Sequence, residues 1–205
     1  MNFEAISQAI AKAASAMTWV EAVAVVLGLL YLILASRESL WCWPAALLSV
    51  CLYIYICLNA KLYSETGLQF FYLAMAIYGW YSWKNGSQSR NEELPITVWP
   101  LRYHIVIILA GSLITILAGY IMDNQTDAAL PYMDAFTTVF SVITTIMVTR
   151  KVLENWLYWI IIDGVGVYMY FQRELFLTSL LFLIYVGIVI YGYFDWQKRM
   201  QTATA

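Results

Sequence analysis

The chain has 205 residues, of which 62% are hydrophobic and only 12% are charged, and its mean hydropathy is +0.70. Soluble domains are about 45–50% apolar and about 25% charged, so this composition excludes an ordinary cytosolic domain and a disordered chain. The formal net charge of -2 also argues against a nucleic-acid-binding protein. We therefore expect an integral membrane protein that crosses the bilayer several times.

The cysteine and histidine content argues against a catalytic or metal-binding centre of the soluble type. Cys42, Cys51 and Cys57 lie in one apolar stretch without CxxC spacing, and His104 is the only histidine in the sequence. Neither a metal-ligand motif nor a glycine-rich phosphate loop occurs. We expect no catalytic residue, no metal and no cofactor, and we predict that the protein is not an enzyme.

Seven stretches are long and apolar enough to cross a membrane as helices, which takes about 20 residues each. Their length and uniform apolarity exclude a closed β-barrel, so we predict an all-α fold. The second stretch contains Pro44, and the fifth is short. The expected spans are residues 19–35, 40–59, 67–83, 104–122, 133–148, 153–171 and 175–194.

Residues 1–18 precede the first span and form a separate segment. Apolar residues recur in it at helical spacing, namely Phe3, Ile6, Ile10, Ala13 and Met17. This pattern favours an amphipathic helix that lies on the membrane surface. A frayed, partly ordered terminus is the alternative.

The distribution of lysine and arginine orients the chain, because cytoplasmic loops are enriched in both residues. One side of the membrane carries only Lys12, Lys61 and Arg173. The other side carries Arg37, Lys84, Arg90, Arg102, Arg150, Lys151, Lys198 and Arg199. We expect the basic side to be cytoplasmic in a bacterial inner membrane, with the N-terminus outside. The linker 84–103 and the tail 197–205 are then cytoplasmic.

The chain repeats itself at an offset of 113 positions, which places residues 19–84 on residues 132–197. Polar and aromatic pairs match at this one offset, including Glu21 with Asp134, Arg37 with Arg150, Trp43 with Trp156, Tyr78 with Tyr191 and Trp83 with Trp196. The pattern predicts two three-helix bundles, 19–83 and 132–196, joined by a linker helix at 104–122. An odd number of helices in each bundle and one helix between them gives a parallel 3+1+3 repeat, the SWEET-like arrangement, in which substrate lies between the halves.

Residues that differ between the halves are candidates for substrate binding, because a shared scaffold residue should occur in both. Asp163 falls in the middle of the sixth span, where the first half has Val50. A carboxylate at the bilayer centre costs about 2.5–3.5 kcal/mol on insertion scales, so it normally faces a cavity or a partner. Gln69 is a second isolated polar residue. A hydrogen bond between helices is the alternative role for both residues.

Aromatic residues share one helix face with Asp163. Successive spacings of three, four and seven residues separate Trp156, Trp159, Asp163 and Tyr170. Two indole rings and an acid on one stripe can stack on a flat ring and attract a positively charged one. Helix packing and a tryptophan belt at the membrane interface are the alternatives, above all for Trp156, because Trp43 repeats it.

Two stretches of the sequence resemble the PnuC-type vitamin transporter family. One runs from Leu62-Tyr63 through Gly67-Leu68-Gln69 to Ile77-Tyr78-Gly79-Trp80-Tyr81-Ser82-Trp83, and the other is 149–156 followed by Trp159. The resemblance covers nearly the whole chain. It implies a SWEET-like fold of seven helices, an external N-terminus and a homotrimer. It also implies that Trp156, Trp159 and Asp163 lie on the substrate-binding helix and that Gln69 faces it.

The family resemblance further implies facilitated diffusion of a non-phosphorylated vitamin, which a cytoplasmic kinase then traps. Nicotinamide riboside is the family's usual substrate, and related branches carry thiamine or riboflavin. This chain has Asp163 and Ala76 where nicotinamide riboside carriers often have asparagine. An ionised aspartate only accepts hydrogen bonds and favours a cation. We expect nicotinamide riboside, with thiamine as the alternative.

A membrane-embedded enzyme or a subunit of a complex is the competing class of function. It requires a second polar group within reach of Asp163, such as Gln69 or Thr145, and a bound cofactor. The sequence contains no metal or redox ligand set that supports it. Proton-coupled transport through Asp163 is a third possibility.

Overall fold

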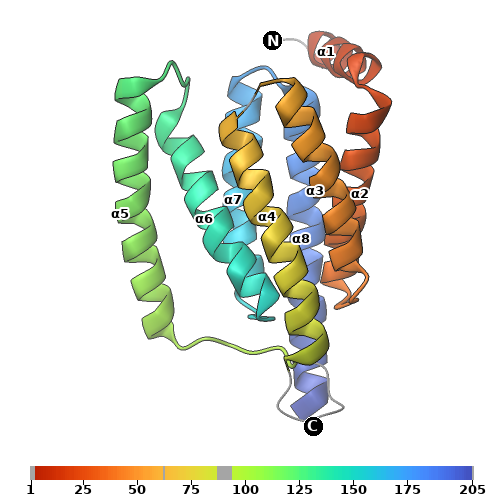
Figure 1. Ribbon diagram of the computed structural model, residues 1–205, viewed down its shortest axis with the longest axis vertical. Coiled ribbons are helices and arrows are strands. Elements are labelled where there is room, and N and C mark those ends of the chain that lie inside the picture. The colour runs from red at the N-terminus through yellow and green to blue at the C-terminus, as the bar shows by residue number, and fades with distance from the viewer. Residues whose placement is uncertain (1–2, 62, 87–93, 205) are drawn as a thin grey trace.

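The computed structural model describes residues 3–61, 63–86 and 94–204. Those residues form eight helices and one isolated parallel bridge, between Thr97 and Val152. All helices except α1 run roughly along one axis (Figure 1). Their bounds are α1 Phe3–Ala16, α2 Trp19–Ser36, α3 Cys42–Asn59, α4 Tyr63–Asn85, α5 Leu101–Gln125, α6 Pro131–Thr149, α7 Asn155–Gln172 and α8 Phe176–Thr204.

Five of these helices (α2, α3, α5, α6 and α8) are long and apolar enough to cross a membrane, which confirms a multi-pass membrane protein. Helices α4 and α7 are less apolar because polar and aromatic residues interrupt them, among them Gln69 and Asp163. Each predicted span falls largely on one helix. The largest difference is in α8, which continues past the predicted end at residue 194 as far as Thr204.

Six helices close into a ring. In one group of three, α2 packs on α3 and α3 packs on α4, and in the other α6 packs on α7 and α7 on α8. The two groups meet along two lines of contact, which we call the α2/α8 seam and the α4/α6 seam. Helix α5 lies outside the ring against α6 (Figure 1). The centre of the ring is therefore bordered by both groups.

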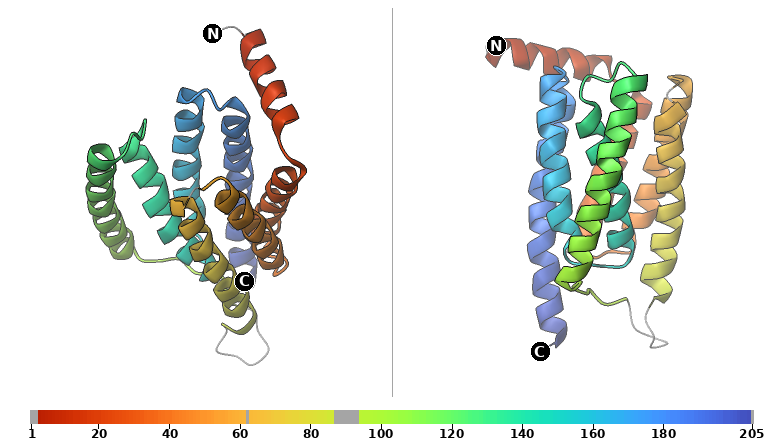
Figure 2. Two further views of the ribbon diagram at one scale, coloured as in Figure 1. Left: turned by 45° about the horizontal axis from the view of Figure 1, so that its top comes forward. Right: turned by 90° about the vertical axis from the view of Figure 1, so that its left-hand side faces the viewer.

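Helix α1 lies across one end of the ring, nearly at right angles to the other helices (Figure 2). It packs against α8, and most of its side chains are exposed. A capping box separates it from α2: Thr18 accepts a hydrogen bond from the Glu21 N–H, and the Glu21 carboxylate accepts one from the Thr18 N–H. Such a cap ends one helix and starts the next in a new direction. Its place on a membrane surface stays a prediction.

Four turns between helices place a residue other than glycine at positive φ. Glu38 has φ 60° and Lys151 has φ 49°, while Lys61 has φ 58° and Glu174 has φ 57°. The two members of each pair are 113 positions apart (151 − 38 and 174 − 61). This conformation costs about 1–2 kcal/mol for a side chain with a Cβ. Packing around each turn must offset that cost, and it does so at corresponding places in the two groups of helices.

Four buried tryptophans, which we call the tryptophan cluster, hold the two groups together near one end of the ring. Trp43 meets Trp83 edge to face at 5.2 Å and 87°, and Trp156 meets Trp196 at 5.2 Å and 90°. The centres of Trp83 and Trp196 are 5.8 Å apart, which joins the two pairs. Edge-to-face ring pairs contribute about 0.5–1.5 kcal/mol beyond their buried area. The cluster therefore closes this end of the ring.

Two reciprocal hydrogen bonds cross between the groups within the cluster. The Trp83 Nε1 donates to the carbonyl of Val148 at 3.1 Å, and the Trp196 Nε1 donates to the carbonyl of Ala35 at 3.0 Å. Both acceptors lie in the last turn of a helix, and each also accepts a backbone hydrogen bond from the turn that follows, from the Lys151 N–H at Val148 and from the Glu38 N–H at Ala35. Each indole bond thus satisfies a buried donor and ties it to the helix end of the other group.

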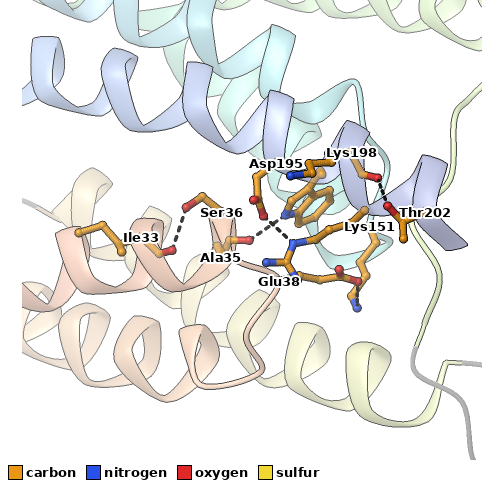
Figure 3. A network of polar contacts seen from close by, with 10 residues as sticks. Ile33, Ala35, Ser36, Glu38, Lys151, Asp195, Lys198 and Thr202 are labelled. Atoms are coloured by element: carbon orange, nitrogen blue, oxygen red, sulfur yellow. Dashed lines mark hydrogen bonds and ion pairs between the residues drawn. The ribbon is translucent and has the colours of Figure 1, made fainter.

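An ion pair connects the two corresponding turns beside the cluster. The Lys151 Nζ lies 2.7 Å from the Glu38 Oε1 and 4.7 Å from the centre of the Trp83 ring. The Lys151 side chain is 1% exposed. Figure 3 shows this pair next to Ala35 and Asp195, where the end of α2 meets α8. Breaking a buried pair by removing one partner is strongly destabilising, so Glu38 and Lys151 couple the two groups.

Gly79 should be essential to the packing of the cluster. A Cβ at this position would lie 2.2 Å from the Trp43 ring, so we expect Gly79→Ala to destabilise the protein by about 2 kcal/mol. The matched control is Gly67→Ala on the same helix, because a Cβ there meets nothing within 4 Å. Thermal unfolding of the purified variants in detergent measures the difference. Equal melting temperatures for the two variants would contradict this account of the cluster.

Candidate functional site

Helix α7 supplies four of the five predicted site residues, and α4 supplies the fifth, Gln69. Asp163 lies halfway along α7, with Trp156 seven residues before it and Tyr170 seven residues after it. At 1.5 Å per residue, each of those two is about 10 Å from Asp163 along the helix axis. Trp159 lies one turn from Asp163. A small molecule at Asp163 therefore reaches Trp159 directly, while Trp156 and Tyr170 mark the two ends of the stripe.

Asp163 is a buried carboxylate that lacks a partner among the described residues. Its side chain is 4% exposed, and the structure gives it neither a hydrogen bond nor an ion pair within the described part of the chain. An ionised carboxylate without a partner is strongly disfavoured in a buried setting. This arrangement is typical of a group whose partner is a ligand, because a bound cation supplies the missing charge.

Trp156 has a packing role that the repeat had suggested for it. It is 1% exposed, its ring meets Trp196, and a Cβ on Gly192 would lie 3.0 Å from it. Its Nε1 has no hydrogen-bond partner among the described residues. Trp159 is half-buried and packs against the edge of the same core. Of the two indoles, Trp159 is therefore the one with a ring surface left for a ligand.

Tyrosines from the other helices extend the site towards the opposite end of the ring. Tyr185 on α8 lies near Asp163 and near Tyr53 on α3, and Tyr53 lies in turn near Tyr170. The Tyr185 hydroxyl is 3.7 Å from the Cβ position of Gly28 on α2. Four helices thus contribute to this region. Sequence comparison of the halves missed Tyr185, because Tyr72 repeats it and a repeated residue was interpreted as scaffold.

Gln69 lies on α4 one turn before Tyr72, next to the polar face of α6. Tyr72 forms a hydrogen bond with Ser141, and Thr144 is fully buried beside it along α6. The Thr144 Oγ1 has no hydrogen-bond partner among the described residues. Gln69 itself is half-buried. The structure therefore places Gln69 on α4 one turn from the contact between Tyr72 and Ser141 at the α4/α6 seam.

Acidic residues gather at the end of the ring beyond Tyr170. Arg173 forms an ion pair with Asp134 and so ties the end of α7 to the start of α6. Glu65 acts electrostatically on Tyr170, and Glu21 acts on Tyr53. Clefts lined by one sign of charge concentrate ligands of the opposite sign. This end of the ring therefore favours the approach of a cation.

His104 has a structural role in this molecule. Its Nδ1 lies 3.0 Å from the Tyr158 hydroxyl, and its Nε2 lies 3.8 Å from the Glu154 carboxylate. Glu154 also accepts a hydrogen bond from the Trp99 N–H. These contacts dock the start of α5 and the linker onto the start of α7. The described residues contain no group of three or more histidine, cysteine or acidic side chains that could hold a metal.

A ring of helices, several of them able to span a membrane, around a buried carboxylate without a partner among the described residues fits a membrane transporter. The sequence profile described as nicotinamide mononucleotide transporter matches residues 18–198. The chain belongs to this family, which confirms the resemblance to PnuC-type transporters and the prediction that it is not an enzyme.

Individual relatives and a solved structure agree with this assignment. The nicotinamide riboside transporter PnuC of Escherichia coli (strain K12) is 29% identical, over 88% of this chain and 85% of the relative. The riboflavin/roseoflavin transporter RibM of Streptomyces davaonensis is 28% identical over the same shares of the two chains. The crystal structure of the vitamin B3 transporter PnuC superposes with a TM-score of 0.70, covers 98% of this chain and 93% of its own, and is 22% identical. The similarity to this crystal structure shows that the two chains share a fold.

Asp163→Asn should weaken the binding of a cationic vitamin by about tenfold, because it removes the charge that the ligand would neutralise. Titration calorimetry of the purified variant measures the affinity, and thermal unfolding verifies that the variant is folded. Glu65→Gln is the matched control, since that acid lies beyond Tyr170 and is expected to change the affinity much less. An unchanged affinity in folded Asp163→Asn would show that Asp163 is not a ligand.

Trp159→Ala should also lower the affinity about tenfold, since stacking of a ring on an aromatic side chain contributes about 1–3 kcal/mol. Trp159→Phe keeps an aromatic surface and should recover most of the binding. The comparison uses the same calorimetric titration. If both variants lose stability and bind equally well, then Trp159 belongs to the packing of the bundle instead.

Proposed function

We propose that the chain is a facilitative inner-membrane transporter of a non-phosphorylated vitamin, with nicotinamide riboside as the first candidate. The observation that carries the proposal is Asp163, which is buried at the middle of α7 with no partner among the described residues and with Trp159 one turn away. A pyridinium ring stacked on Trp159 would place its positive charge near that carboxylate. The relatives named nicotinamide riboside transporter support the same ligand class.

The charges around the site favour the riboside over the mononucleotide in the family's name. A phosphate monoester carries a charge of about −1.5 to −2 at neutral pH. Within the described part of the chain, no basic side chain pairs with Asp163, and Arg173 is already paired with Asp134. A phosphate placed beside Asp163 would therefore meet a like charge. This supports a substrate that lacks the phosphate, which a cytoplasmic kinase would add after entry.

Alternating access between the two groups of helices is the mechanism that fits this arrangement. We interpret the groups as a parallel 3+1+3 repeat of seven spans, α2 to α8, with bundles at 19–83 and 132–196. The recurrence of the positive-φ turns and of the crossed tryptophan bonds at an offset of 113 supports that interpretation. The tryptophan cluster closes one end of the ring. Opening that end requires both crossed bonds and the Glu38–Lys151 pair to break.

The basic residues support an external N-terminus and a cytoplasmic C-terminus. Arg37, Arg150 and Lys151 follow the ends of α2 and α6, at the same end of the ring as Lys198 and Arg199. The positive-inside rule places that end in the cytoplasm. The acidic end beyond Tyr170 then faces outward, where it would collect a cationic vitamin.

A homotrimer is the assembly that we infer from the family resemblance. Helix α5 lies outside the ring, and many of its large apolar side chains are exposed along its length. Such a surface fits either lipid or a neighbouring subunit. The exposed helix supports assembly through α5.

Thiamine is the second candidate substrate. Asp163 accepts hydrogen bonds and favours a cation, and the thiazolium of thiamine is a cation. Ala76, the second departure from the usual asparagine, is 3% exposed. Its methyl side chain contributes no polar group. The RibM relative illustrates that members of this family differ in the vitamin they carry.

Titration calorimetry with nicotinamide riboside, nicotinamide mononucleotide, thiamine and riboflavin in parallel tests the proposal. We expect the riboside to bind at least about tenfold more tightly than the mononucleotide, because Asp163 repels the phosphate. Tight binding of thiamine alone would transfer the assignment to that vitamin. Tighter binding of the mononucleotide than of the riboside would overturn the argument from charge, and binding of none of the four would overturn the proposed function.

A further inference from the structure

A groove outside the candidate site runs along the α2/α8 seam, near the end of the ring that holds the tryptophan cluster. Ile33 of α2 and Ile184, Gly187 and Ile188 of α8 line its length. Arg37 and Tyr191 line the part nearest to the end of α2. Figure 3 shows Ile33 and Ser36 on the last turns of α2, beside α8. The groove thus lies between the two groups of helices and opens outward from the ring.

The groove is apolar along its length and positively charged at one end. A Cβ on Gly187 would meet nothing within 4 Å, so the absent side chain leaves space there. Arg37 is exposed, and its side chain has no hydrogen-bond or ion-pair partner among the residues that the structure describes. The nearby Arg199, in contrast, is paired with Asp195. The one guanidinium is therefore available to an external anion, and the other is not.

The α4/α6 seam offers an internal comparison. Tyr78 and Arg150 line a groove there as well. At the offset of 113 positions, Tyr78 corresponds to Tyr191 and Arg150 corresponds to Arg37. The linker residues Leu94, Thr97 and Trp99 form part of the lining of that groove. Thr97 is held in place by backbone hydrogen bonds to the turn after α6, at 2.9 and 2.8 Å. The linker therefore contributes to the groove at the α4/α6 seam, whereas α2, Arg37 and α8 alone line the groove at the α2/α8 seam.

We propose that the α2/α8 groove binds an anionic glycerophospholipid of the surrounding membrane. The phosphate would pair with the Arg37 guanidinium, and one acyl chain would lie along Ile33, Gly187 and Ile184. Basic pockets between membrane-spanning helices on the cytoplasmic side bind acidic lipid headgroups in this manner. A lipid in this place touches both groups of helices, so it stabilises the contact between α2 and α8. The inference rests on the membrane location and not on the identity of the vitamin.

Native mass spectrometry of the detergent-purified protein tests the proposal. The protein is titrated with dioleoyl phosphatidylglycerol and, in parallel, with dioleoyl phosphatidylcholine. We expect the first phosphatidylglycerol to bind about fivefold more tightly than phosphatidylcholine. Arg37→Ala should abolish this preference, whereas Arg150→Ala, the corresponding change at the α4/α6 seam where linker residues share the groove, should preserve it. Equal affinities for the two lipids in the unmodified protein, or equal effects of the two variants, would overturn the proposal.

Two further measurements distinguish the contribution of the acyl chain to binding from that of the phosphate. Gly187→Leu places a larger side chain in the apolar groove, at a position where a Cβ meets nothing within 4 Å, and should weaken the first binding of phosphatidylglycerol, while Gly67→Leu on α4 should not. Glycerol 3-phosphate at millimolar concentration should not displace the lipid, because it lacks the acyl chains. Displacement would indicate a site for free phosphate, and unchanged lipid binding by Gly187→Leu would exclude the groove. Vitamin affinity measured on the same samples reports on the proposed function independently.

Discussion

Two crossed hydrogen bonds from buried indoles are the contacts on which the arrangement of the helices depends. Trp83 donates to the end of α6, and Trp196 donates to the end of α2. A buried indole N–H needs an acceptor, and each bond supplies one at a helix end of the other group, so it satisfies a donor whose burial would otherwise be costly. Because each donor comes from the third helix of one group and each acceptor from the first helix of the other, the bonds fix both seams together.

The same contacts explain how a ring of helices can tolerate a carboxylate at its centre. Asp163 has no partner among the described residues, so its burial costs stability unless a ligand is present. The tryptophan cluster and the Glu38–Lys151 pair hold the end of the ring closed against that cost. A transporter must release these contacts to open that end, so their strength is also a barrier to transport. The tryptophan cluster and the Glu38–Lys151 pair thus stabilise the closed end and at the same time oppose its opening.

Part of this molecule was predictable from the residues, because the evidence for it is local or periodic. Runs of apolar side chains predicted where the helices lie, and polar residues that differ between the halves singled out Asp163 and Gln69. Other parts were not predictable by that argument. Tyr185 is repeated by Tyr72 and so was interpreted as scaffold, yet it lies near Asp163. Trp156 shares a helix face with Asp163, yet it packs in the cluster about 10 Å away along the axis.

The sequence by itself determined the class of the protein, the helices and the family, since hydropathy and residue spacing depend on neighbours along the chain. Only the tertiary structure decided which side chains meet across the ring. It buried Trp156 against Trp196 and left Trp159 half-buried, and it formed a groove beside Arg37 from α2 and α8 alone while linker residues share the lining of its counterpart. The physical reason is that these outcomes depend on contacts between residues far apart in the chain, which no local pattern records.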